Sequence, residues 1–162
     1  MSELRPLRSP AAPCKLLQQA LPWLVVVLLA GLAGCNLRIT PDRSSGPDGE
    51  RYSAPGAKLN LVYNDSVDYD NGDATDWRFV LIGQQGILTL TCHFDEIDAK
   101  TVVHIRDAVG NIMAEQFHNG QPRQELTAKV NEGKYYLEVK AMESGSASPY
   151  TCEPKFDPVV WN

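Results

Sequence analysis

The sequence predicts an all-β protein whose folded domain is an antiparallel β-sandwich or barrel. From Lys58 onward, short runs of alternating apolar and polar residues recur about every ten residues. Turn-forming pairs, among them Asn71-Gly72 and Gly110-Asn111, separate these runs. Period-two alternation with turns at this spacing is typical of antiparallel sheets. No helical periodicity extends beyond about two turns, so we expect little helix.

Six runs are expected to be strands: residues 76–83, 86–94, 101–107, 110–116, 135–140 and 150–156. In the first run, Trp77, Phe79 and Leu81 share one phase of the alternation. In the second run, Cys92 shares the phase of Phe94. The tight turn between the third and fourth runs predicts a hairpin.

The first 34 residues have the features of a secretory signal. Arg5, Arg8 and Lys15 precede an apolar run over residues 21–33. As a helix this run would span about 20 Å, short of the ~30 Å hydrocarbon core of a bilayer. A permanent transmembrane helix is therefore the weaker interpretation. Basic residues, a short apolar run and small residues before a cleavage point predict an exported chain.

The apolar run ends in Leu-Ala-Gly-Cys at residues 32–35, which resembles the lipobox of bacterial lipoproteins. The resemblance implies cleavage between Gly34 and Cys35, a diacylglyceryl thioether on Cys35, and a further acyl chain on the new amino terminus. Several acyl chains would anchor the protein stably to the lipid bilayer. Asn36 follows the cysteine, and the absence of aspartate at that position favours the outer membrane. The alternative is an ordinary secretory signal with a chance cysteine.

Residues 36–57 are rich in proline, glycine and polar residues and carry no apolar periodicity. This composition predicts a flexible tether. The expected division is a signal peptide at 1–34, the lipidated cysteine with a disordered tether at 35–57, the sandwich at 58–157 and a short tail at 158–162. The alternative is that the tether is an ordered extension packed on the domain.

Charge and cysteine content narrow the classes of partner. The chain carries 15 basic and 20 acidic residues, and without residues 1–34 these become 12 and 19, a net charge of −7. Such an acidic chain is a poor ligand for nucleic acid or for anionic lipid surfaces. Cys14 would leave with the signal, whereas Cys92 and Cys152 lie on the inward phases of two different runs. Export favours a disulfide between them, and the alternative is two separate buried thiols.

Five segments resemble, in order, those of bacterial pre-peptidase C-terminal (PPC) domains: residues 71–79, 86–91, 103–110, 132–139 and 148–151. The resemblance covers residues 65–157 and implies a jelly-roll-like β-sandwich similar to carbohydrate-binding modules. Members of that family usually follow a secreted protease or other exported enzyme, where they aid secretion or bind an insoluble substrate. Here a lipid anchor and a tether stand in place of the enzyme.

Acidic residues are densest over residues 65–76, which are expected to form a loop. Calcium takes six to eight oxygen ligands from such loops. The candidate ligands for Ca²⁺ are Asp68, Asp70, Asp73 and Asp76. The segment is not an EF-hand, because Phe79 stands at the twelfth position counted from Asp68, where that motif has glutamate. Some relatives in the PPC family bind calcium near this segment. The alternative is a solvated turn held by Asx hydrogen bonds.

No catalytic constellation stands out, since the sequence lacks the Gly-x-Ser-x-Gly and His-Glu-x-x-His motifs. His93 and His104 lie on the polar phases of their runs, which predicts surface positions. Tyr136 also points outward by phase, and Trp161 lies in the tail. Either aromatic residue could stack on a sugar or anchor a partner protein, and the alternative is ordinary surface.

These observations predict a non-catalytic, membrane-anchored envelope lipoprotein. Its β-sandwich is expected to act as a binding or assembly module for an envelope protein or a polysaccharide. The alternatives are an accessory subunit of a secreted hydrolase or protease, acting in substrate targeting or secretion, and a weakly marked hydrolase. The expected location is the bacterial cell envelope, with the outer membrane favoured.

Overall fold

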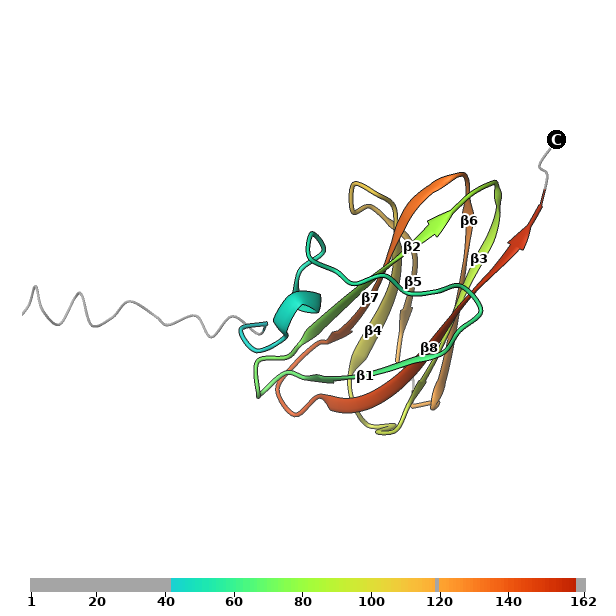
Figure 1. Ribbon diagram of the computed structural model, residues 1–162. Coiled ribbons are helices and arrows are strands. Elements are labelled where there is room, and N and C mark those ends of the chain that lie inside the picture. The colour runs from blue at the N-terminus through green and yellow to red at the C-terminus, as the bar shows by residue number, and fades with distance from the viewer. Residues whose placement is uncertain (1–41, 119, 160–162) are drawn as a thin grey trace, which may run out of the picture. The chain divides into compact units, whose positions relative to one another are not determined.

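The computed structural model describes residues 42–118 and 120–159, whose strands form a β-sandwich (Figure 1). The elements in chain order are η1 (Gly46–Gly49), β1 (Tyr63–Asp68), β2 (Thr75–Ile82), β3 (Gly86–Phe94), β4 (Thr101–Arg106), β5 (Ile112–Phe117), β6 (Arg123–Val130), β7 (Gly133–Ala141) and β8 (Ala147–Pro158). Within this part of the chain, one sheet has the order β1-β8-β3-β6 and the other the order β2-β7-β4-β5. All the strand pairs are antiparallel. Eight strands divided between two sheets in this way form a jelly roll, so the predicted fold class is confirmed.

The core between the two sheets is built by the alternating residues of the predicted strands. On β3, Leu88, Leu90 and Cys92 are fully buried, and on β7 Leu137 and Val139 are almost fully buried. Burial of one such aliphatic side chain contributes roughly 1.5–3 kcal/mol. The predicted hairpin is present as well, since β4 and β5 pair along their length. For these strands, apolar alternation therefore predicted both their positions in the chain and the faces that they bury.

Two strands, β1 and β6, were not among the predicted strands. In β1 only Val67 is buried, so apolar alternation is lacking there. In β6 the alternation is present, with Leu126, Ala128 and Val130 buried, and only the first inward residue, Gln124, is polar. The acidic segment 65–76 is consequently not one loop, because Asp65 belongs to β1 and Asp76 to β2.

Cys92 and Cys152 form the predicted disulfide. They are direct cross-strand partners on β3 and β8, with their Cα atoms 4.1 Å apart. Both side chains are buried in the core. The bond therefore links two neighbouring strands within one sheet rather than joining the two sheets.

Residues 42–57, expected to belong to the tether, pack on the sandwich instead, and we call them the strap. The backbone N–H of Ala57 donates to the carbonyl of Phe79 (2.7 Å), and the N–H of Phe79 donates to the carbonyl of Pro55 (3.0 Å). The strap thus pairs with the outer edge of β2, and its η1 lies against β2 (Figure 1). The ordered-extension alternative holds for residues 42–57, while residues 35–41 lie outside the described part of the chain.

Candidate functional site

The outer side of the β2-β7-β4-β5 sheet gathers aromatic and charged side chains. Trp77, Phe79 and Leu81 share one phase of β2, as predicted, and this phase points outward because Val80 on the opposite phase fills the core. Pairing across the sheet places Tyr136 of β7 beside Phe79. We call this surface the outer face; its residues are Trp77, Phe79, Leu81, His104, Arg106, Glu115, Lys134, Tyr136, Glu138 and Lys140.

Two cations, Lys134 and Arg51, lie near the ring of Tyr136 on the outer face. The Nζ atom of Lys134 is 4.1 Å from the ring centroid of Phe79 and 4.9 Å from that of Tyr136. From the strap, the guanidinium carbon of Arg51 lies 5.6 Å from the same Tyr136 centroid. Such cation–π contacts contribute ~0.5–1 kcal/mol at exposed sites. The side chain of Tyr136 points outward, as predicted, but it is only 7% exposed.

A network of charged side chains crosses the outer face from β7 to β5. The Nε2 atom of His104 lies 2.9 Å from a carboxylate oxygen of Glu115, and its Nδ1 atom lies 2.8 Å from one of Glu138. Arg106 donates from Nε to the same Glu138 oxygen at 2.6 Å. These partners bury His104, so its predicted surface position is wrong, whereas His93 is exposed as predicted.

Glu138 is the centre of this network. Burial alone would raise the pKa of its carboxyl, but the hydrogen bonds from His104 and Arg106 outweigh burial and hold the pKa below its ordinary value. The carboxylate therefore stays ionised and fully engaged with its two partners. This network ties β4, β5 and β7 together.

Carboxylates from three segments meet on the β1 and β2 side of the sandwich. Asp48 of the strap, Asp65 of β1 and Asp76 of β2 each place an oxygen within 4.8 Å of the others, and we call them the acidic cluster. Arg78 forms ion pairs with Asp48 at 3.4 Å and with Asp65. Tyr150 of β8 donates its hydroxyl to Asp76 at 2.7 Å.

Asp76 is the buried member of the acidic cluster, with 2% of its surface exposed. Burial raises the pKa of its carboxyl, the Tyr150 hydrogen bond lowers it in part, and the charges of Asp65, Asp73 and Asp48 raise it further, to about 8. Asp76 therefore carries a proton at neutral pH. With Asp76 neutral, Arg78 pairs with the other two carboxylates, so the cluster keeps a net negative charge.

Two of the four predicted calcium ligands face away from the acidic cluster. Asp68 accepts hydrogen bonds from the backbone N–H groups of Asp70 and Asn71, both at 3.1 Å, which is an Asx turn. Asp70 accepts from the backbone N–H of Gly145 at 2.8 Å. Asp68 and Asp70 therefore accept turn and loop hydrogen bonds, as the alternative interpretation of a solvated turn expects.

The other two predicted ligands lie in or beside the acidic cluster. Asp76 belongs to it, and Asp73 is close enough for the charges of Asp48 and Asp65 to add to the effect of burial, which raises the pKa of the Asp73 carboxyl. Asp48 and Asp65 were not among the predicted ligands. The sequence feature that could have pointed to Asp48 and Asp65 is Arg78, which lies on the inward phase of β2. A charged side chain that points inward requires partners of opposite charge.

The acidic cluster could hold a metal ion such as Ca²⁺. Its three members offer carboxylate oxygens, the donors that hard cations prefer. Two features oppose an ion: Arg78 already pairs with Asp48 and Asp65, and Asp76 is protonated at neutral pH. A bound cation would therefore have to displace the Asp76 proton and compete with Arg78.

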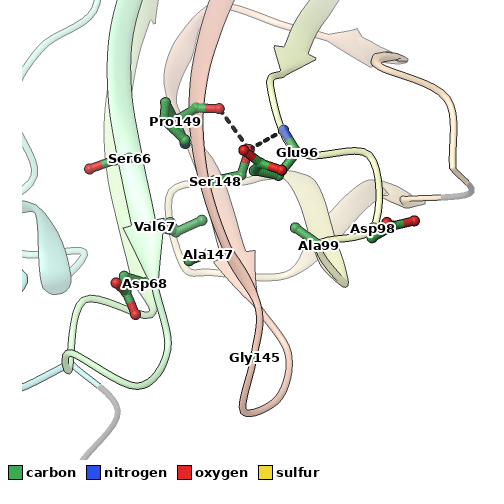
Figure 2. A pocket seen from close by; sticks show the side chains of 10 residues that line it. All are labelled: Ser66, Val67, Asp68, Glu96, Asp98, Ala99, Gly145, Ala147, Ser148 and Pro149. Atoms are coloured by element: carbon green, nitrogen blue, oxygen red, sulfur yellow. Dashed lines mark hydrogen bonds between the residues drawn. The ribbon is translucent and has the colours of Figure 1, made fainter.

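A cavity of about 520 Å³ opens between β1, β8 and the loop that joins β3 to β4 (Figure 2). Its lining residues are Ser66, Val67, Asp68, Glu96, Asp98, Ala99, Gly145, Ala147, Ser148 and Pro149. The hydroxyl of Ser148 accepts from the backbone N–H of Glu96 (3.0 Å) and donates to the carbonyl of Pro149 (2.7 Å). The titratable side chains of the lining are Asp68, Glu96 and Asp98, and the Ser148 hydroxyl is hydrogen-bonded to backbone groups.

The predicted cleavage and lipidation residues, Gly34 and Cys35, lie outside the described residues, as does Trp161. No helix within residues 42–118 and 120–159 is long and apolar enough to cross a membrane. Lipid anchoring through Cys35 therefore stays a prediction from the sequence.

Several solved structures are similar to this chain to different degrees. The pre-peptidase C-terminal domain of a collagenase from Bacillus anthracis superposes with a TM-score of 0.55 at 20% identity, over 63% of this chain and 94% of that one. A periplasmic inhibitor of g-type lysozyme from Aeromonas hydrophila gives a TM-score of 0.46 at 11% identity, over 64% and 96%. A carbohydrate-binding module of a Cellvibrio mixtus lichenase, solved with cellotriose, gives 0.38 at 13% identity, over 63% and 92%.

The sequence itself matches no model of a known protein family, and no curated protein matches it either. At 20% identity the likeness to the collagenase domain shows the fold alone. The fold that the PPC resemblance implied is therefore present, and the three similar structures named above are a PPC domain, an inhibitor and a binding module. Function has to be argued from the residues of this chain.

Proposed function

We propose that this protein is a non-catalytic binding module, held on the bacterial cell envelope by acyl chains on Cys35. The observation that carries the proposal is the Leu-Ala-Gly-Cys sequence at residues 32–35, placed ahead of a disulfide-bonded β-sandwich. The Cys92–Cys152 disulfide supports an oxidising, extracytoplasmic compartment. Asn36 after the lipidated cysteine favours the outer membrane.

The absence of catalysis is supported by how the polar groups of the described residues are used. His104 is engaged by Glu115 and Glu138, and the hydroxyl of Ser148 is engaged by backbone groups. The partner is an envelope protein or a polysaccharide, which the sandwich meets while Cys35 keeps it at the membrane. The competing role, an accessory subunit of a secreted hydrolase, predicts that such an enzyme co-purifies with the lipidated protein.

Replacing the lipidated cysteine tests the anchor. We expect the Cys35→Ser variant to move from the membrane pellet to the soluble fraction, because the thioether cannot form. Cys14→Ser is the matched control, since it removes a cysteine of the signal and should leave the protein in the membrane. Unchanged membrane association of Cys35→Ser would refute the lipoprotein assignment. Affinity purification from native membranes, with partners identified by mass, then distinguishes a binding module from an enzyme subunit.

A second proposal, calcium binding at the acidic cluster, is supported by the convergence of Asp48, Asp65 and Asp76. Calcium should raise the melting temperature of the protein, and more so at pH 9 than at pH 6, because the ion must displace the Asp76 proton. Asp65→Asn should remove this effect, whereas Asp98→Asn, an exposed carboxylate of the β3–β4 loop, should preserve it. A melting temperature that is identical in CaCl₂ and in EGTA at both pH values would exclude the site.

A further inference from the structure

We infer that Arg51 and Lys134 form a binding site on the outer face for the carboxylate groups of an acidic polysaccharide. The inference rests on the proposed binding function and names the ligand class. Both cations lie within 6 Å of one ring centroid, that of Tyr136, at 5.6 and 4.9 Å. One comes from the strap and the other from β7, so the site exists only in the folded chain.

Neither cation has an acidic partner among the described residues. Arg51 donates only to the hydroxyl of Tyr52 at 3.3 Å, and Lys134 contacts aromatic rings. Arg106 and Arg78 differ in this respect, since Arg106 pairs with Glu138 and Arg78 with two aspartates. Two positive charges without an acidic partner therefore lie around one tyrosine ring in a protein whose formal net charge is −5, and they create a local attraction for anions.

The presence or absence of ion pairs distinguishes the outer sides of the two sheets. On the outer side of the β1-β8-β3-β6 sheet, Arg123 pairs with Glu125, and Lys155 pairs with Glu153 at 2.9 Å. Those charges are neutralised within the protein, so an anionic ligand gains less there. The unpaired cations single out the face that carries Arg51 as the anion-binding one.

The Arg51 guanidinium is held in place before any ligand arrives. A Cβ atom added at Gly110 would stand 1.9 Å from its Nη1 atom, so the group packs directly on the Gly110 backbone. The rings of Tyr52 and Tyr136 lie 5.2 and 5.6 Å from it. A guanidinium fixed in this way binds a carboxylate through two parallel hydrogen bonds at a reduced entropic cost.

The aromatic residues favour an acidic sugar over a neutral one. The cations occupy the rings of Phe79 and Tyr136, and these rings are therefore less accessible for stacking on an uncharged sugar. Tyr52 stands beside Arg51 and is 85% exposed. A pyranose ring can pack on Tyr52 while its carboxylate binds Arg51, and another carboxylate of the same polysaccharide chain can bind Lys134.

Binding of polygalacturonate to the full-length protein in non-ionic detergent tests the inference. We expect binding that weakens with salt and that is at least about tenfold weaker for the fully methyl-esterified polymer, which has the same backbone without charge. Arg51→Gln/Lys134→Gln should weaken binding by at least about tenfold. The matched control Lys129→Gln/Lys155→Gln removes two charges from the other sheet and should leave binding unchanged. Arg51→Lys keeps the charge but loses the planar guanidinium that donates two parallel hydrogen bonds, so it should give an intermediate affinity.

Three results would overturn the inference. They are no binding of polygalacturonate by the unaltered protein, equal loss of binding in the control pair, or equally tight binding of poly-glutamate. A melting temperature close to that of the unaltered protein shows that the Arg51→Gln/Lys134→Gln variant is folded. A failure here leaves the membrane-release result for Cys35→Ser untouched, so the inference and the proposed function fail separately.

Discussion

Asp76 shows how a single residue couples the fold to pH. Its carboxyl has an ordinary pKa of 3.8, and burial raises it to about 8 in the folded protein. The folded state therefore binds this proton more tightly than the unfolded chain. The resulting stabilisation is complete below about pH 4 and is lost as the pH rises toward 8.

The Asp76→Asn variant should remove this pH dependence, because asparagine is neutral at every pH and can still accept the Tyr150 hydrogen bond. Between pH 5 and 9 the free energy of unfolding of the unaltered protein should fall by at most about 4 kcal/mol more than that of the variant. Urea unfolding in EGTA measures the difference, and Asp98→Asn should behave like the unaltered protein. Equal stability of the unaltered protein at pH 5 and pH 9 would contradict the role given to Asp76.

Glu138 makes the opposite contribution, because its stabilisation depends on the ionised form. Glu138→Gln should lower the free energy of unfolding by about 3 kcal/mol at pH 7, since it leaves His104 and Arg106 facing a neutral amide in a buried position. Glu115→Gln is the matched comparison, because the side chain of Glu115 is 39% exposed, and it should cost less than about 1 kcal/mol. Equal losses in the two variants, measured by urea unfolding, would show that burial of Glu138 does not decide the effect.

At the scale of elements, the strap is the part of the chain that sequence patterning places wrongly. Its prolines and glycines are typical of a flexible linker, and it has no apolar repeat. Contacts with distant residues hold it in place: hydrogen bonds with Phe79, the ion pair of Asp48 with Arg78, and the contact of Arg51 with the Tyr136 ring. These partners lie 20 residues or more away along the chain, beyond the reach of any local pattern.

Removing the strap should expose the edge of β2. A chain that begins at residue 58 should exchange the Phe79 amide hydrogen faster than one that begins at residue 42, because Pro55 no longer accepts its hydrogen bond. The bare edge should also cause concentration-dependent association. Hydrogen exchange and sedimentation measure the two effects. Slow exchange at Phe79 in both chains would mean that the strap does not protect this edge.

At the scale of the whole molecule, the jelly roll joins strands that are far apart in sequence. β8 lies between β1 and β3, so this sheet is completed only when the last strand of the chain is in place. Such non-local pairing makes loop closure a large part of the cost of folding. The disulfide between Cys92 and Cys152, 60 residues apart, reduces that cost by restricting the unfolded chain.

Removing the disulfide should therefore weaken the whole sandwich. Cys92→Ala/Cys152→Ala should lower the free energy of unfolding by about 3–4 kcal/mol on the loop-closure argument. Guanidinium unfolding of the oxidised protein, the reduced protein and the double variant measures the effect, and the reduced protein should resemble the variant. An unchanged transition midpoint in both would show that the bond is not needed for stability.

The sequence by itself determined the fold class, the faces of β3, β4, β7 and β8, and the partners of the disulfide. These features follow from period-two alternation and from cysteines on inward phases, which are local properties. It did not reveal β1, where Val67 is the one buried residue, and β6 was not predicted although Leu126, Ala128 and Val130 alternate along it.

Only the tertiary structure decided which charges meet. It brings Asp48 of the strap to Asp65 and Asp76, and it places both Arg51 and Lys134 near one tyrosine ring. It also turns the aromatic phase of β2 outward, where the sequence showed only that these residues share a phase. Ion pairs and ring contacts join side chains from different strands, so they depend on strand order and register, which alternation along one strand does not encode.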